Sequence, residues 1–322
     1  MTPLSFSVLR ILSDCRFHSG EDIAQTLGVS RASVCNAAKS MAASNLTLDR
    51  VRGRGYRLNR PFEWLDRNSV TEMLAEKAGR FNIEIRDSVD STNSELLREN
   101  GPHGRVLAAE MQTMGRGRMG RSWLSEPGGA LTFSLAWKFD RGAGFLSGLS
   151  LAVGIALARA MASCGIESIR LKWPNDVLYQ FHKVAGILIE VKGDMLGPTL
   201  AVIGMGINFR LSKAIKENID QAVTGIDSIP GKNPGRNKLL AAVLAELSDI
   251  LETFEESGFE AFRQEWCDRH AYHMKPVRLK LPSGKTEEGR VVGVSEKGEI
   301  LIESSRGKLA FASGEVSLRG IA

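Results

Sequence analysis

The spacing of apolar residues divides the chain into three regions. Apolar residues three or four positions apart predict helices over residues 4–14, 19–28 and 29–44, and alternating apolar residues predict a strand hairpin over 45–59. Between residues 81 and 270, strand-like stretches alternate with helix-like stretches. Beyond that point the pattern contains only short strands separated by glycine turns. The chain is therefore predicted to fold as several different units.

These regions predict a multidomain α+β protein. We expect residues 1–62 to form a winged helix-turn-helix, residues 63–270 a mixed α/β domain, and residues 271–322 a small β-barrel. The pattern changes at Pro61, and a short helix follows, which is typical of a hinge between domains.

In the first region, helix signals stand at the spacing of a helix-turn-helix. Ser19 and Ser30 are candidate N-caps, and Gly28 is a helix-stop residue between them. The two helices are thus joined by a short turn, and the second is expected to enter the major groove of DNA. The first helix is predicted to bury one apolar face, formed by Leu4, Val8, Ile11 and Leu12.

Charge supports a nucleic-acid-binding role for this region. Residues 1–60 contain nine lysines and arginines against four acidic residues, whereas the remainder has 33 of each, so the net charge of +5 lies in the first region. Arg52, Arg54 and Arg57 are placed at the tip of the hairpin, where they can contact phosphates. Base contacts are expected from the second helix of the motif, through Arg31, Ser33, Asn36 and Lys39. Because the middle of this helix, "CNAA", is apolar, a protein-protein adaptor is the alternative.

The middle region predicts a sheet packed on helices. Strands are expected over 105–113, 129–139, 169–179, 182–193 and 199–210, and helices over 148–165, 237–258 and 259–270. Residues 81–100 are predicted to form a strand, a polar turn and a helix capped around Ser91. No stretch of about 18 uncharged apolar residues occurs, so no membrane span is expected.

The N-terminus and the cysteines indicate the compartment. The N-terminus lacks the charge and apolar pattern of a signal peptide. Four cysteines lie far apart without a CxxC pair, at Cys15, Cys35, Cys164 and Cys267. A disulfide framework or zinc site is therefore not predicted, and a cytoplasmic location is expected.

The first candidate binding element is "GRGRMGRSW", residues 115–123, called the Gly/Arg loop here. Its glycines let backbone N–H groups approach an anion, and its arginines offer forked donors that match phosphate. Trp123 can stack on a purine base. The loop lies between two predicted strands and occurs once, unlike a low-complexity RNA-binding tail. A surface loop without a ligand remains the alternative.

The second candidate element is "KWPND", residues 172–176, followed by Lys183 inside an apolar strand. A lysine at such a position either faces a cavity or extends to solvent from the strand end. Asn175 and Asp176 offer oxygen ligands of the kind that Mg²⁺ prefers, although Asp176 can equally be a turn residue after Pro174. A third element, "DSTN" at residues 90–93, can bind a neutral polar ligand or can simply cap a helix.

The segments "DSTN", "QTMGRGRMGRSW", "KWPNDVL", "KVAGILIE" and "GMGINF", in this order and spacing, resemble the biotin protein ligases. With the winged helix, the chain is similar to the bifunctional subgroup that also represses biotin synthesis genes. The resemblance covers essentially the whole chain. It implies a central ligase domain of the biotin/lipoate type, an SH3-like C-terminal barrel, and biotin, ATP and Mg²⁺ as ligands. Members of the family usually have a small or polar residue where this chain has Met114. Because of this departure, the resemblance does not fix the conformation of the loop without a ligand.

The resemblance also implies roles for individual residues. Lys183 and Arg118 would be catalytic, and Asp176 would lie beside Mg²⁺. Biotin would be bound by Ser91, Thr92, Asn93, Gln112, Arg116, Gly117, Arg118 and Lys183. The nucleotide would be bound by Arg121, Trp123, Lys172, Asn175, Asp176 and Asn208.

The resemblance finally implies a reaction and partners. Biotin would be activated to biotinyl-5′-AMP and transferred to a lysine of a biotin acceptor domain in a carboxylase carrier protein. The adenylate-bound form would be a homodimer that binds operator DNA. Two alternatives stay open: a lipoate-type ligase with the same central fold, and a transcriptional regulator that senses a small molecule without turning it over.

Overall fold

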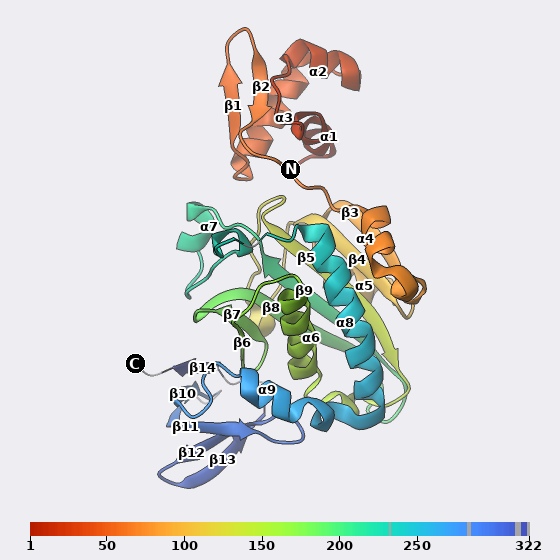
Figure 1. Ribbon diagram of the computed structural model, residues 1–322. Coiled ribbons are helices and arrows are strands. Elements are labelled where there is room, and N and C mark those ends of the chain that lie inside the picture. The colour runs from red at the N-terminus through yellow and green to blue at the C-terminus, as the bar shows by residue number, and fades with distance from the viewer. Residues whose placement is uncertain (232, 282–284, 313–316, 321–322) are drawn as a thin grey trace.

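The computed structural model describes residues 1–231, 233–281, 285–312 and 317–320. Figure 1 shows the N-terminal unit at one end of the molecule, a large sheet with helices in the middle, and a small sheet at the other end. This is the multidomain α+β architecture that the apolar pattern predicts. None of the helices within the described ranges is long and apolar enough to cross a bilayer.

The N-terminal unit is a winged helix. It consists of α1 (Pro3–Leu12), α2 (Gly20–Leu27), α3 (Arg31–Ala43), β1 (Leu48–Val51) and β2 (Gly55–Leu58). The predicted caps are confirmed, because the side chains of Ser19 and Ser30 accept hydrogen bonds from the backbone of α2 and α3. Gly28 ends α2 in the left-handed conformation, with φ at 63°, which glycine adopts without strain.

Two expectations for this unit are wrong in part. The buried face of α1 includes Phe6 and Leu9, which the apolar spacing did not select, whereas Leu4 and Ile11 are only partly buried. Arg57 is not at the tip of the hairpin but within β2, where its guanidinium lies 2.6 Å from the Asp49 carboxylate. The pairing of β1 with β2 places these two residues opposite each other, and their opposite charges attract.

The connection to the central domain is firmly attached to that domain. The helix α4 (Arg67–Leu74) and the 3-10 helix η1 (Ala75–Arg80) follow the linker, as the sequence predicts. The backbone N–H of Leu65 donates to Glu110 at 2.7 Å, and the other carboxylate oxygen of Glu110 accepts from Arg236 at 2.7 Å. Because this ion pair is almost fully buried, it fixes the linker against the sheet.

The central domain contains a seven-stranded sheet in the order β3-β4-β5-β9-β8-β7-β6. Only β3 and β4 are parallel, and the other neighbours are antiparallel. The strands are β3 (Asn82–Val89), β4 (Arg105–Gln112), β5 (Ala130–Phe139), β6 (Ile169–Lys172), β7 (Asp176–Tyr179), β8 (His182–Gly193) and β9 (Thr199–Asn208).

The predicted single strand over residues 169–179 is wrong. The chain reverses there, and β6 and β7 form an antiparallel hairpin in which Lys172 faces Asp176. The turn contains Pro174, preceded by a cis peptide bond, and proline has no N–H to contribute to a strand ladder. The turn thereby brings the two charged ends of "KWPND" to the same place.

Helices cover both faces of this sheet (Figure 1). On β5, Leu135 and Trp137 belong to the large core with α6 (Leu149–Ser163) and α8 (Arg236–Ser257), whereas Ala136 packs with Leu96 of α5 (Thr92–Arg98). Alternate residues of a strand point to opposite faces, so α5 lies across the sheet from α6 and α8. Shorter helices complete the domain: η3 (Ala143–Leu146), α7 (Lys213–Glu217), η4 (Ile226–Ser228), η5 (Gly258–Phe262) and α9 (Arg263–Arg269).

The C-terminal unit is a five-stranded antiparallel sheet in the order β13-β12-β11-β10-β14. Its strands are β10 (Pro276–Lys280), β11 (Thr286–Val294), β12 (Ile300–Ser304), β13 (Gly307–Phe311) and β14 (Ser317–Gly320). It contacts the central domain through the turn between β11 and β12, where the carbonyl of Gly298 accepts a hydrogen bond from the Trp173 indole at 3.0 Å. The C-terminal unit is thus in direct contact with the β6–β7 turn.

Candidate functional site

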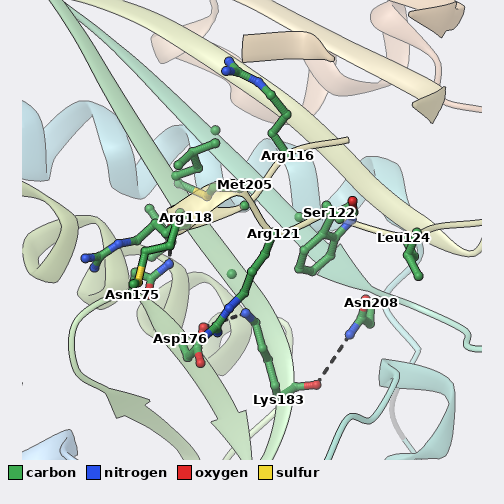
Figure 2. A pocket seen from close by; sticks show the side chains of 18 of the residues that line it. Arg116, Arg118, Arg121, Ser122, Leu124, Asn175, Asp176, Lys183, Met205 and Asn208 are labelled. Carbon is green, nitrogen blue, oxygen red and sulfur yellow. Dashed lines mark hydrogen bonds and ion pairs between the residues drawn. The ribbon is translucent and has the colours of Figure 1, made fainter. Parts of the chain in front are cut away.

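One pocket brings together the catalytic, biotin-binding and nucleotide-binding residues predicted from the sequence. It lies between the Gly/Arg loop, the N-terminal end of α5, the β6–β7 hairpin, and strands β8 and β9 (Figure 2). All fourteen of these predicted residues line it: Ser91, Thr92, Asn93, Gln112, Arg116, Gly117, Arg118, Arg121, Trp123, Lys172, Asn175, Asp176, Lys183 and Asn208. Segments more than 100 residues apart in the chain therefore contribute to a single site.

The Gly/Arg loop is an ordered, hairpin-like connection between β4 and β5. Arg116 and Ser122 face each other across it in an antiparallel bridge, and the N–H of Trp123 donates to the carbonyl of Gly115 at 2.8 Å. A short 3-10 turn, η2 (Arg118–Gly120), forms its tip. Met114, the residue at which the chain departs from the family, is 70% exposed at the base of the loop.

The three arginines of the loop point in different directions. The side chains of Arg118 and Arg121 point into the pocket, whereas Arg116 points away from it (Figure 2). Burial lowers the pKa of the Arg118 guanidinium, and the negative charge of Asp176 opposes that shift. An arginine stays protonated under these conditions, so Arg118 brings a partly desolvated positive charge into the pocket.

Two glycines of the sheet form the surface on which the Trp123 indole rests. A Cβ added at Gly206 would lie 2.3 Å from Trp123, and one added at Gly186 would lie 3.2 Å from it. These residues are paired across β8 and β9, so a flat patch without side chains lies under the ring. These two positions were not predicted from the sequence, although a glycine inside a strand pattern is a known sign of close approach.

Lys183 faces the pocket and not the solvent. Its Nζ lies 2.6 Å from Oδ1 of Asp176, and Lys172 Nζ lies 3.8 Å from Oδ2 of the same carboxylate. The Lys183 side chain is only 16% exposed, so the alternative in which it extends to solvent is wrong. The side-chain amide of Asn208 donates to the Lys183 carbonyl and helps to fix this part of β8.

Four positive side chains therefore line the pocket together with the Asp176 carboxylate: Arg118, Arg121, Lys172 and Lys183 (Figure 2). Such an excess of positive charge in a partly buried pocket favours a ligand with several negative charges. Asn175 lines the same pocket and also has a partner within the protein. Its side-chain amide donates to the carbonyl of Ile187 at 2.7 Å and ties the hairpin to β8.

Asp176 does not fit a magnesium ligand in this arrangement. Both of its oxygens lie beside lysine ammonium groups. Within the described ranges, there is also no cluster of three or more His, Cys, Asp or Glu side chains that could hold a metal. Mg²⁺ is commonly bound by one or two carboxylates together with substrate phosphates, so the protein alone does not build this site.

The "DSTN" segment both caps a helix and lines the pocket. The Ser91 side chain caps α5. The N–H of Thr92 donates to Oε1 of Gln112 at 2.8 Å, which leaves the Gln112 amide hydrogens for other partners. Asn93 is bonded to Ser134 and Glu190, two residues that the sequence analysis missed because both contacts are long-range.

The predicted DNA-contacting residues all lie on the N-terminal unit, although one of them is half-buried. In α3, Arg31, Asn36 and Lys39 are exposed, whereas Ser33 is half-buried and its hydroxyl is bonded to Ser30 at the cap. Arg52 and Arg54 are exposed in the turn between β1 and β2, and the Arg54 guanidinium lies over the ring of Phe17. The unit therefore presents positive charge on both the helix and the wing.

Comparison with known protein families agrees with this division of the chain. Residues 5–57 match a helix-turn-helix domain, residues 85–208 match the biotin/lipoate A/B protein ligase family, and residues 275–319 match the biotin protein ligase C-terminal domain. Each match lies within one of the three domains predicted from the sequence, whose boundaries stay a prediction.

Individual relatives cover nearly the whole chain. The bifunctional ligase/repressor BirA of Salmonella typhimurium is 32% identical over 99% of this chain and 98% of its own length. The protein of the same name from Escherichia coli is 32% identical over 97% and 96%. A biotin protein ligase from Aquifex aeolicus, solved in complex with biotin and ATP, is similar with 34% identity and a TM-score of 0.65, covering 74% of this chain and 99% of that one. The chain belongs to the biotin/lipoate A/B protein ligase family, among its bifunctional ligase/repressor members.

Proposed function

We propose that this protein activates biotin with ATP and transfers it to a lysine of a biotin acceptor domain in a carboxylase carrier protein. The main observation that supports this proposal is the pocket, in which four positive side chains converge near Asp176: Lys183, Lys172, Arg118 and Arg121. Two anionic reactants repel each other in water, and converging positive charges in a partly buried site offset that repulsion. The family membership supports the same reaction.

The geometry favours one orientation of the reactants. The uncharged end of the pocket, formed by Ser91, Thr92 and Gln112, suits the polar head of biotin. Lys183 and Arg118 lie where the biotin carboxylate and the α-phosphate of ATP would meet. The nucleotide would extend past Arg121, Lys172 and Asn208, with the adenine packed on Trp123.

The chemistry requires positioning more than covalent participation by the protein. An oxygen of the biotin carboxylate forms a bond to the α-phosphorus, the bond from that phosphorus to the bridging oxygen breaks, and pyrophosphate leaves. The acceptor lysine amine then attacks the carbonyl carbon of biotinyl-5′-AMP, loses a proton, and AMP leaves. Lys183 and Arg118 lower the barrier of the first step by neutralising charge that develops between the reactants. The Gly/Arg loop excludes water from the mixed anhydride.

A magnesium ion is not assigned to a protein ligand here. Because both oxygens of Asp176 are paired with lysines, Mg²⁺ is proposed to enter with ATP, held by phosphate oxygens. Asp176 instead keeps the two lysines close together before the substrates bind.

We further propose that the adenylate-bound protein is a homodimer that binds operator DNA. Two features support this regulation. The winged helix is basic. In addition, residues 188–193 of β8 have no strand partner on the side of β7 within the described part of the chain. An unpaired strand edge can form backbone hydrogen bonds with the same strand of a second copy of the chain. Two winged helices would then reach two half-sites of an operator. Four cysteines without disulfides support a cytoplasmic location.

Labelling of an acceptor domain separates a ligase from a sensor. With biotin and ATP, the wild-type protein should attach biotin to an acceptor lysine, and K183A should not. Operator binding measured with and without biotin and ATP tests the regulatory part. A protein that binds operator equally well under both conditions contradicts the proposed coupling while leaving the ligase reaction intact.

A further inference from the structure

Glu190 of β8 joins two walls of the pocket through one oxygen atom. Its Oε2 accepts a hydrogen bond from Nη2 of Arg116 at 2.6 Å and another from Nδ2 of Asn93 at 2.9 Å. Arg116 belongs to the Gly/Arg loop on one side of the pocket, called the cover here. Asn93 belongs to α5 on another side, called the floor. A single carboxylate therefore holds the cover to the floor.

The floor side of this connection is rigid. The Asn93 amide also donates to the carbonyl of Leu188 at 3.2 Å, and its oxygen accepts from the Ser134 hydroxyl at 2.5 Å. The side chain fits against Gly204, where an added Cβ would lie 2.1 Å from its oxygen. Both amide hydrogens of Asn93 are thereby used within the protein, so Asn93 positions Glu190 and has no further donor for a ligand.

The cover side depends on Arg116. This residue stands at the base of the hairpin-like loop, where it is bridged to Ser122. Its guanidinium points away from Lys183 and Asp176 (Figure 2) and donates to Glu190. The tip of the loop carries Arg118 into the pocket, so a contact that holds Arg116 also holds Arg118 in place.

We propose that Glu190 is a positioning residue that keeps the Gly/Arg loop closed over the adenylate. This inference rests on the proposed ligase function. In this arrangement Arg116 acts through Glu190 and does not bind biotin directly. Loss of the contact should let the loop open more often, and the mixed anhydride should then escape or react with water before it reaches an acceptor.

The size of the effect follows from the exposure of the pair. Arg116 is 41% exposed and Glu190 is 26% exposed, so the ion pair is partly screened by water. Such pairs contribute up to about 1 kcal/mol, which corresponds to an effect of roughly fivefold on the closed fraction of the loop. The second hydrogen bond, to Asn93, makes the full removal of Glu190 more disruptive than the loss of its charge.

The experiment compares four full-length variants with wild type: E190Q, R116A, their double variant, and E288Q. The last removes the negative charge from a similar pair, in which Arg278 lies 2.6 Å from Glu288 in the C-terminal sheet. Each protein is incubated with radiolabelled biotin, ATP and pyrophosphatase, freed of excess ligand, and followed for release of labelled biotinyl-5′-AMP. Biotin affinity, biotin-dependent pyrophosphate exchange and thermal stability are measured in parallel.

We expect E190Q and R116A each to release the adenylate about two- to fivefold faster than wild type. The double variant should release it no faster than R116A, because both changes break the same contact. In E190Q, biotin affinity and the exchange rate should stay within about twofold of wild type, and E288Q should resemble wild type throughout.

Three results would overturn the inference. Release at the wild-type rate in both E190Q and R116A means that the pair does not hold the loop. Weakened biotin affinity in R116A with unchanged release means that Arg116 contacts biotin directly. An equal increase in E288Q means that the effect is unspecific. If wild type forms no biotinyl-5′-AMP, the proposed function itself fails, which is a separate outcome from unchanged release.

Discussion

The ammonium group of Lys183 lies 2.6 Å from the carboxylate of Asp176, and this pair stands where β7 and β8 come together in the pocket. A lysine ammonium in an apolar strand loses much of its hydration, and a nearby carboxylate offsets the cost of that loss. The pairing orients Lys183 before any substrate enters. The site is therefore already arranged to receive anions, which is the condition for electrostatic catalysis.

Removal of the Lys183 ammonium should abolish most of the first half-reaction. K183A is expected to lower biotin-dependent pyrophosphate exchange on the order of 10²–10³-fold, because the charge between the two reactants is no longer neutralised. The measurement is exchange of labelled pyrophosphate into ATP. K138A, which alters an exposed lysine on β5, should exchange at the wild-type rate. Equal activity of K183A and K138A would contradict the assigned role.

A methyl group at Gly206 should disturb the seat of Trp123. The added Cβ would lie 2.3 Å from the indole, so the ring must move away from the sheet. We expect G206A to raise the KM for ATP about tenfold, in line with the cost of overpacking. G79A is the matched control, since an added Cβ there meets nothing within 4 Å. An unchanged KM for ATP in G206A would show that the position of Trp123 does not matter for the nucleotide.

Burial of His270 should make the fold sensitive to acid. Burial lowers the pKa of His270 to about 3, far below its ordinary value of 6.5, and the neutral ring stacks on Trp266. The unfolded chain therefore takes up a proton below pH 6.5 while the folded protein does not. The free energy of unfolding should fall by about 1.4 kcal/mol for each pH unit in that window and should be fully retained above it.

Urea unfolding at several pH values between 7 and 5 measures this effect. H270F keeps the ring contact with Trp266 and should make the loss of stability below about pH 6.5 less steep than in wild type. H182F changes an exposed histidine on β8 and should leave the wild-type pH dependence intact. A pH dependence of H270F that matches wild type would mean that His270 does not titrate on unfolding.

The two arginines in the wing should contribute to DNA affinity through phosphates. We expect R52A and R54A each to weaken binding to duplex DNA and to reduce the slope of log K against log salt by about one. R57A should change the slope less, because Arg57 is already paired with Asp49. Titration of labelled duplex at several salt concentrations gives these slopes. An R57A effect as large as that of R52A would contradict this distinction.

Local signals predicted the winged helix and the helix caps well. Ser19, Ser30 and Gly28 act within a few residues of their own position, so their roles are visible in sequence. The same holds for the strand, turn and helix around Ser91. The position of Arg57 was wrong because the register of the hairpin depends on the turn, which a count of residues does not fix.

Long-range relationships account for the rest. The strand-like pattern over residues 169–179 concealed the turn at Pro174, although proline within a strand pattern is itself a sign against one continuous strand. Gly186 and Gly206 acquire their role only when Trp123 is placed over them. Nothing near Glu190 in the sequence indicates that Arg116, 74 residues away, is its partner. Such contacts depend on the tertiary fold.

The most direct test of the account is pyrophosphate exchange into ATP by the purified protein, with biotin or lipoate as the acid. The account predicts exchange that depends on biotin and is absent with lipoate, because the pocket combines a neutral polar end with four converging cations. Exchange with lipoate alone would assign the protein to the lipoate branch of the family. Exchange with neither acid would contradict the central claim and indicate a DNA-binding sensor without catalysis.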